Sequence, residues 1–210
     1  MNDMLKELFE RYPSLAACEA DILAAEEQMM AAYKSGGKIM VCGNGGSCAD
    51  SEHIVGELMK GFLLMRHMDK ATEQKFRDVL GDDADEFVDK LQGGIPAISL
   101  PSQSAVLSAF VNDVDPALMY AQLVYGYARE GDLLISISTS GNSKNAVAAA
   151  KVAKAMGIAT LALTGANDSK LSAICDTTVR VPETETFKVQ ELHLPVYHYL
   201  CASVEKRIFG

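Results

Sequence analysis

Five short apolar segments, each flanked by helix-like sequence, constrain the fold of this 210-residue chain more than any other feature. Short apolar runs without polar alternation are typical of strands that are buried on both faces. Their alternation with helices predicts an α/β fold, a three-layer, doubly wound sheet of five parallel strands. The segments are KIMVC (38–42), IPAISL (95–100), DLLISI (132–137), IATLAL (158–163) and TTVRV (177–181).

Long helices are expected at both ends of the chain. Apolar residues recur at helical spacing through residues 3–34, with a break expected at Pro13 and an end at Gly36. Near the C-terminus, VQELHLPVYHYL (189–200) belongs to another helix, in which Pro195 should cause a kink. No linker, repeat or shift in composition divides the chain, so residues 1–210 are expected to form a single domain.

The connection between the first two strands is unusually long and highly charged. Within it, residues 63–94 are expected to form a helical insertion, a solvated appendage of the domain. Its sparse apolar anchors are Phe76, Leu80, Phe87 and Leu91.

Composition restricts the classes of partner. A hydrophobic content of 49% excludes wholesale disorder, and a net charge of −9 argues against a broad nucleic-acid surface. An anionic ligand would therefore need a local site built from backbone N–H groups and hydroxyls. The five scattered cysteines include no C-x-x-C pair, and no segment is typical of a signal peptide or a membrane span. We therefore expect a reduced, cytoplasmic protein with no membrane or nucleic-acid partner.

Two loops at strand ends are candidates for ligand binding. The segment Gly43-Asn44-Gly45-Gly46-Ser47 follows the first strand, and it is either a plain strand-to-helix turn or an anion loop. It lacks the Gly-Lys-Ser/Thr of a Walker A loop. The segment Ser138-Thr139-Ser140-Gly141-Asn142-Ser143 is more specific, because four hydroxyls in six residues exceed the needs of helix capping. We interpret this second loop as a phosphate site.

Acid, base and metal-ligating side chains recur on two predicted helices. His53 and Glu57 are four residues apart, on one helix face, which suits an acid/base pair, shared metal ligation or a solvated ion pair. On the last helix, His198 shares a broad face with Gln190 and is better aligned with Glu191, so spacing leaves its partner open.

Together these segments resemble the sugar isomerase (SIS) domain, and more closely its phosphoheptose isomerase family. The resemblance covers nearly the whole chain apart from residues 63–94. It implies a flavodoxin-like fold, a homotetramer, and an aldose–ketose isomerase that converts sedoheptulose 7-phosphate to D-glycero-D-manno-heptose 7-phosphate. The hydroxyl loop is common to SIS domains, whereas the His-x-x-x-Glu and Gln-to-His spacings are specific to the isomerases.

The resemblance also implies roles for individual residues. Glu57 and His198 would be the catalytic acid/base pair. A zinc ion, weakly bound, would be held by His53, Glu57, Gln190 and His198. Substrate would be bound by Asn44, Gly45, Gly46, Ser47, Asn112, Asp113, Ser138, Thr139, Ser140, Ser143 and Gln190.

This assignment is consistent with elementary chemistry. Aldose–ketose isomerisation moves a proton between adjacent carbons through an enediol, which a carboxylate and an imidazole can accomplish near neutral pH. Zinc would polarise the carbonyl. Two departures from the family pattern leave the sugar open: the insertion beside Glu57, and Phe187-Lys188-Val189 where the family often has an acidic residue. The alternatives are an isomerase of another sugar phosphate, and a non-catalytic SIS protein that senses phosphosugars or binds a replication initiator.

Overall fold

A single parallel sheet organises residues 3–210, which are the residues that the computed structural model describes. Its strand order is β2-β1-β3-β4-β5, and every neighbouring pair is parallel. Four strands lie within the apolar segments and β4 ends one residue beyond its segment, at Thr164, so the predicted sheet is confirmed. The strands are β1 (Ile39–Cys42), β2 (Ala97–Ser99), β3 (Leu133–Ile137), β4 (Ala159–Thr164) and β5 (Thr177–Arg180).

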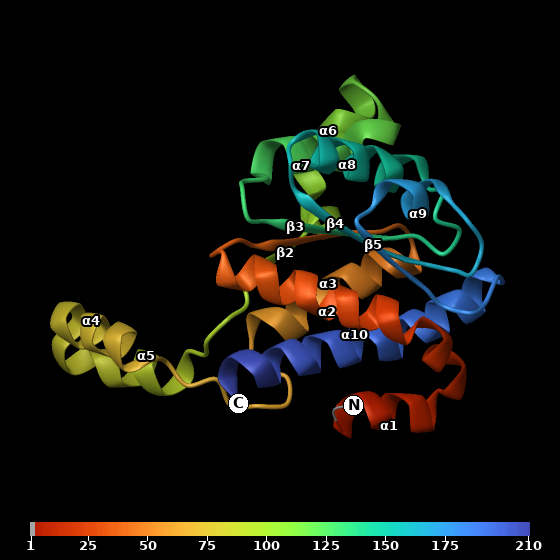
Figure 1. Ribbon diagram of the computed structural model, residues 1–210. Helices are drawn as coiled ribbons and strands as arrows, with labels where there is room; N and C mark the ends of the chain where they lie inside the picture. The colour runs from red at the N-terminus through yellow and green to blue at the C-terminus, as the bar shows by residue number, and fades with distance from the viewer. Residues whose placement is uncertain (1–2) are drawn as a thin grey trace.

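Helices cover both faces of the sheet and complete the three predicted layers (Figure 1). One face carries α2 (Glu19–Lys34), α3 (Gly46–Met59) and α10 (Thr186–Phe209), with α1 (Asp3–Arg11) packed against α10. The other face carries α6 (Ser104–Asp113), α7 (Met119–Tyr127), α8 (Lys144–Ala155) and α9 (Lys170–Ile174). Short 3-10 turns occur at Pro13–Cys18, Gly81–Asp83, Leu100–Ser102 and Pro116–Leu118.

The two prolines in the long terminal helices have different outcomes. Pro13 separates α1 from the rest of the N-terminal segment, as the sequence predicts, because α1 ends at Arg11 and a 3-10 turn begins at Pro13. Pro195 does not end α10, which runs on as one helix to Phe209. Within residues 3–210, no helix combines the length and apolar character needed to cross a bilayer.

The pleat of the strands explains why the apolar segments show no polar alternation. In β1, Ile39 and Val41 belong to the core beneath α2, α3 and α10, whereas Met40 and Cys42 belong to the core beneath α7 and α8. All four residues are buried. Because helices cover both faces, both sets of alternating side chains leave water.

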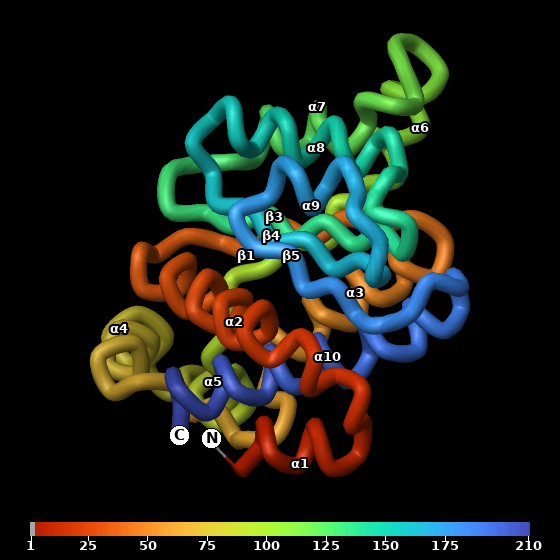
Figure 2. Tube along the Cα trace, turned by 45° about the vertical axis from the view of Figure 1, so that its right-hand side comes forward, coloured from red at the N-terminus to blue at the C-terminus, as the bar shows by residue number. Residues whose placement is uncertain are grey.

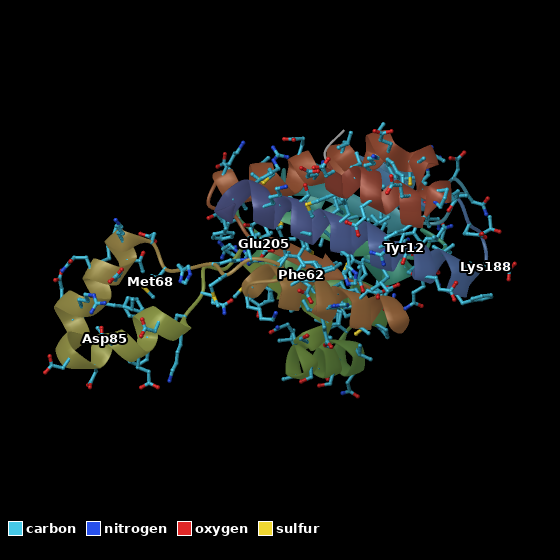
Figure 3. The ribbon with its side chains drawn as sticks, turned by 90° about the horizontal axis from the view of Figure 1, so that it is seen from below. Tyr12, Phe62, Met68, Asp85, Lys188 and Glu205 are labelled. Atoms are coloured by element: carbon cyan, nitrogen blue, oxygen red, sulfur yellow. The ribbon has the colours of Figure 1, made fainter. Side chains whose placement is uncertain are left out.

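A helical hairpin projects from the body of the protein, formed by α4 (Lys70–Leu80) and α5 (Ala84–Lys90) (Figures 1 and 3). Helices therefore form over part of the predicted range 63–94, while its status as an insertion stays a prediction. Only two of the expected anchors pack together, Phe76 and Phe87, whose ring centroids are 6.4 Å apart. Leu80, Phe87 and Leu91 stay 37%, 42% and 47% exposed, so three of the four expected anchors are only partly covered.

A buried ion pair fixes the base of this hairpin to α10. The Arg66 Nε donates to Glu205 Oε1 at 2.7 Å, and both side chains are fully buried. Glu205 also accepts backbone N–H bonds from Phe62 and Leu63 at 2.7 Å each. Phe62 and Glu205 lie at this junction in Figure 3. Such a pair adds little net stability over apolar packing, but losing one partner leaves an uncompensated buried charge.

We expect Glu205→Gln to lower the free energy of unfolding by about 3–5 kcal/mol at neutral pH. Burial alone would raise the pKa of Glu205, but the bonds from Phe62, Leu63 and Arg66 outweigh it, so the pKa lies below its usual 4.5. The stabilisation that the ionised carboxylate provides is fully present above pH 4.5, the usual pKa of this side chain. It is lost as the pH falls through the lower pKa of the folded state. The difference in the free energy of unfolding between wild type and variant should therefore become smaller in acid.

Urea unfolding from neutral pH down into acid measures this difference. A difference that stays constant with pH would contradict the assignment. Glu73→Gln, which removes an exposed partner of Arg77 on the hairpin, is the control and should leave the free energy of unfolding nearly unchanged.

Candidate active site

Two loops meet at the carboxyl ends of β1 and β3, where the order of the sheet reverses. The chain leaves β1 for α3 on one face of the sheet and leaves β3 for α8 on the other, which opens a crevice at this edge. The loops are residues 43–47 and 138–143. Each leads directly into the N-terminus of a helix, where free N–H groups and the helix dipole favour an anion.

Polar contacts hold the two loops together. The amides of Asn44 and Asn145 exchange two hydrogen bonds of 2.8 Å, which join the loops across the crevice. Tyr120 donates its hydroxyl to the carbonyl of Gly43 at 2.7 Å. Sequence reasoning missed Tyr120 and Asn145. Asn145 lies two residues after the hydroxyl loop, so its position was a signal, whereas the contact of Tyr120 depends on how α7 packs.

The hydroxyl loop is folded back on itself. Ser138 and Ser143 lie with their Oγ atoms 2.9 Å apart, and Ser140 Oγ accepts the backbone N–H of Asn142. The loop turns at Gly141, whose φ of +64° is in the left-handed region that favours glycine. Thr139 and Ser47 also lie in the two loops, as the sequence predicts. Their placement is consistent with phosphate binding and does not by itself test it.

Gly46 brings the start of α3 close to α10. A Cβ at this position would lie 1.9 Å from Nε2 of Gln190, so a larger residue here would require the Gln190 amide to move. Gln190 also donates to Oδ2 of Asp50 at 3.4 Å. The structure therefore brings Gln190 to the glycine loop, whereas the neighbouring Glu191 is exposed. Helical spacing left open which of these two residues belongs to the site, and the structure favours Gln190.

A second cluster lies further along α3, where α10 runs beside it (Figure 2). Nε2 of His53 is 3.2 Å from Oε1 of Glu57, and the rings of His53 and His198 have centroids 5.0 Å apart. Oε2 of Glu57 and Nε2 of His198 are buried and have no hydrogen-bond partner within residues 3–210. Three of the predicted catalytic or metal-binding side chains thus come together from two helices.

The environment of His198 favours a neutral imidazole. Burial lowers its pKa, and His53 and Arg11 lower it further, while Glu57 acts in the opposite sense. A cavity of about 390 Å³ between α1 and α10 reaches this ring. His193, one and a half turns earlier, is a core residue: it is fully buried, contacts the carbonyl of Thr164, and has a pKa lowered to about 4 by burial.

Asp50 and Tyr197 belong to the same cluster, and sequence reasoning missed both. The Tyr197 hydroxyl lies 3.0 Å from Nδ1 of His53 and donates to Oδ1 of Asp50 at 3.2 Å. Burial raises the pKa of Asp50, against the bonds from Tyr197 and Gln190. Asp50 precedes His53 by three residues, so helical spacing could have identified it. Tyr197 offers no such signal, because its contact depends on the register between α3 and α10.

The donor atoms of this cluster fit the chemistry of zinc in kind. His53, Glu57 and His198 supply nitrogen and carboxylate donors, and the two unpartnered buried atoms are free to bind a cation. Gln190 is held by Asp50 and would have to turn. Within residues 3–210, no three His, Cys, Asp or Glu side chains are already arranged so that they could hold a metal ion.

Two predicted substrate-binding residues lie apart from both loops. Asn112 and Asp113 end α6, which projects from the sheet (Figure 2), and their side chains are exposed and bonded to each other at 2.8 Å. The described contacts do not join them to residues 43–47 or 138–143. Their predicted role in the sugar site is therefore not supported by this chain alone.

Comparison with known proteins places this site in context. Residues 4–78 and 103–201 match the SIS domain family. A phosphoheptose isomerase from Clostridium acetobutylicum is 36% identical over 184 residues, which cover 88% of this chain and 81% of the relative. One from Rhodospirillum rubrum is 33% identical over 191 residues, 91% of this chain and 88% of the relative. The solved phosphoheptose isomerase of Neisseria gonorrhoeae superposes with a TM-score of 0.72 at 27% identity, covering 95% of this chain and 94% of that one.

We expect Gly141→Ala to destabilise the protein more than Gly157→Ala. Both glycines have a positive φ, so alanine costs about 1–2 kcal/mol at either position. At Gly141, the added Cβ would also lie 2.1 Å from Oγ of Ser169, whereas nothing lies within 4 Å at Gly157. Urea unfolding compares the free energies of unfolding of the two variants. The rise in melting temperature on addition of inorganic phosphate shows whether the hydroxyl loop still binds phosphate. Equal losses of stability would contradict the crowded geometry described here.

Proposed function

The chain belongs to the phosphoheptose isomerase family of SIS-domain proteins, and from that membership and the geometry of its site we propose that it interconverts sedoheptulose 7-phosphate and D-glycero-D-manno-heptose 7-phosphate. The observation that carries the proposal is the convergence of His53, Glu57 and His198 from α3 and α10. A phosphate-binding module that performs no catalysis has no need of this cluster.

The phosphate is held by neutral donors in this proposal. Ser138, Thr139, Ser140 and Ser143 offer hydroxyls, and the starts of α3 and α8 offer backbone N–H groups. Such a site needs no basic patch, in keeping with the net charge of −9. Ser47 is proposed to help hold the phosphate, and Asn44, Gly45, Gly46 and Gln190 are proposed to contact the sugar.

Two side chains are proposed to move the protons. Glu57 takes a proton from the carbon beside the carbonyl and returns it to the neighbouring carbon, and its Oε2 is free of protein partners for this purpose. His198, kept neutral by its lowered pKa, transfers a proton between the two oxygens of the enediol. Both atoms that exchange protons, Oε2 and Nε2, are shielded from bulk water.

A zinc ion is proposed as the cofactor, held by His53, Glu57 and His198, with Gln190 as a weaker fourth ligand. When bound, zinc would supply a Lewis acid that polarises the carbonyl and steadies negative charge on the enediol oxygens. The unpartnered atoms of Glu57 and His198 support this assignment. Because the same two atoms are proposed to exchange protons, zinc would be coordinated loosely or through a shared water.

We expect Glu57→Gln and His198→Asn to lower kcat by about 10²–10⁴-fold or more each, because each removes a proton-transfer group. Binding of phosphate, which involves the loops, should change little. Aldose formation from a panel of ketose phosphates, with and without added zinc, provides the measurement. A wild-type rate in either variant would exclude the mechanism. Turnover of a different ketose would reassign the sugar, and no turnover on any would favour a non-catalytic phosphosugar sensor.

The protein is also proposed to form a homotetramer. No residue of α6 is buried, and Val106, Val111 and Val114 are exposed on or next to this projecting helix. A second copy that covers α6 would bury these side chains. It would also bring Asn112 and Asp113 against another chain, where they could complete a sugar site.

We expect a tetramer by light scattering, and Val111→Lys should shift the population to smaller species by placing a charge in the interface. Val79→Lys on the hairpin, where the native side chain is 81% exposed, is the control and should leave the mass unchanged. A monomeric wild-type protein would refute the assembly.

A further inference from the structure

We propose that Asp50 and Tyr197 are positioning residues, which hold the His53 imidazole with its proton on Nδ1 and its Nε2 directed at Glu57. The catalytic part of this inference rests on the proposed isomerase function, whereas the orientation of His53 can be tested without it. Neither residue is part of either loop, and neither is a predicted ligand or acid/base group.

With Asp50 ionised, the hydrogen bonds have one consistent direction. An ionised carboxylate can only accept, so Asp50 Oδ1 takes the hydroxyl proton of Tyr197 across 3.2 Å. With its single proton used, the Tyr197 oxygen acts as an acceptor toward Nδ1 of His53 at 3.0 Å. In a histidine, the bond made by one ring nitrogen sets the state of the other. Nδ1 therefore carries the proton, and Nε2 of the neutral ring presents a lone pair.

That lone pair faces a carboxylate oxygen. Nε2 of His53 lies 3.2 Å from Oε1 of Glu57, and two acceptor atoms at this distance repel unless a proton or a cation lies between them. Fixing the proton on Nδ1 thus reserves Nε2 for a shared proton or a metal ion. With the opposite tautomer, Nε2–H would instead donate permanently to Glu57 and weaken it as a base.

The ring of Tyr197 adds a steric constraint. It meets the His53 ring edge-on, with centroids 5.5 Å apart and planes at 79°, and the His198 ring similarly at 5.1 Å and 85°. Tyr197 is almost fully buried, so its ring cannot swing away. It therefore limits rotation of both imidazoles, and its hydroxyl selects the tautomer of one of them.

Asp50 extends the same control to a third site residue. Its Oδ2 accepts from Nε2 of Gln190 at 3.4 Å, while its Oδ1 accepts from Tyr197. One carboxylate on α3 therefore orients two side chains of α10. Outer partners of this kind change activity by about 10–100-fold when they are removed.

Tyr197→Phe provides the test, because it removes the hydroxyl and keeps the ring. Tyr199→Phe is the matched control: Tyr199 lies two residues further along α10, is also buried, and donates its hydroxyl to Oε2 of Glu26 at 2.7 Å. Tyr197→Phe removes the bonds to His53 and Asp50, and Tyr199→Phe removes the bond to Glu26, so unfolding temperatures are measured for both variants beside their activity. We expect kcat to fall by about 10–100-fold only in Tyr197→Phe, with KM nearly unchanged.

Imidazole ¹⁵N NMR of the full-length protein gives a readout that does not depend on turnover. The His53 resonances, identified by their loss in His53→Asn, should show the Nδ1–H form in wild type and in Tyr199→Phe. Tyr197→Phe should shift them toward the Nε2–H form, and Asp50→Asn should do the same. An unchanged His53 signal in Tyr197→Phe would overturn the proposal. Unchanged kcat with a shifted tautomer would overturn its catalytic part alone. If no sugar phosphate is converted, the proposed function fails and the NMR result still decides the positioning.

Discussion

The packing of α10 along α3 is the interaction on which the site depends. Gln190 lies against Gly46, Tyr197 against His53, and Glu205 against Phe62, just beyond the end of α3, so the two helices run in the same direction and in fixed register. A slip of one residue would rotate each α10 side chain by about 100° away from its partner. The register thus determines whether the carboxylate of Glu57 and the imidazoles of His53 and His198 meet at all.

Polar contacts also join these two helices, and they confer specificity more than stability. The buried Arg66–Glu205 pair at one end stabilises little over apolar packing, yet it admits few alternative arrangements. Arg66 also donates to the carbonyl oxygens of Leu58 and Glu57, at 2.5 and 2.8 Å, so it caps the last turn of α3. The backbone that carries Glu57 is therefore anchored by groups that cannot leave without exposing a buried charge.

The sequence predicts those features that depend on local pattern. The five strands, the two loops and the one-turn spacing of His53 and Glu57 follow from burial, turn chemistry and helical period. Tyr197 and Asp50 could not be paired from the sequence, because their contact depends on the register of two helices far apart in the chain. Leu80 and Leu91 were misjudged for a related reason: an apolar residue at helical spacing is buried only where a second apolar surface reaches it. Asn112 and Asp113 show another limit, since in this structure they end an exposed helix and bond to each other.

The hairpin of α4 and α5 leaves and re-enters the body at almost the same point. The N–H of Gly93 bonds to the carbonyl of Arg66 at 2.8 Å, and the N–H of Gly61 bonds to the side chain of Gln92 at 2.7 Å. The two ends of this excursion are thus closed by their own hydrogen bonds, and the length of chain between them has little entropic consequence for the remainder. Evolution can consequently extend, shorten or recompose the hairpin as a separate module, while the end of α3 and the carboxylate of Glu57 keep their place.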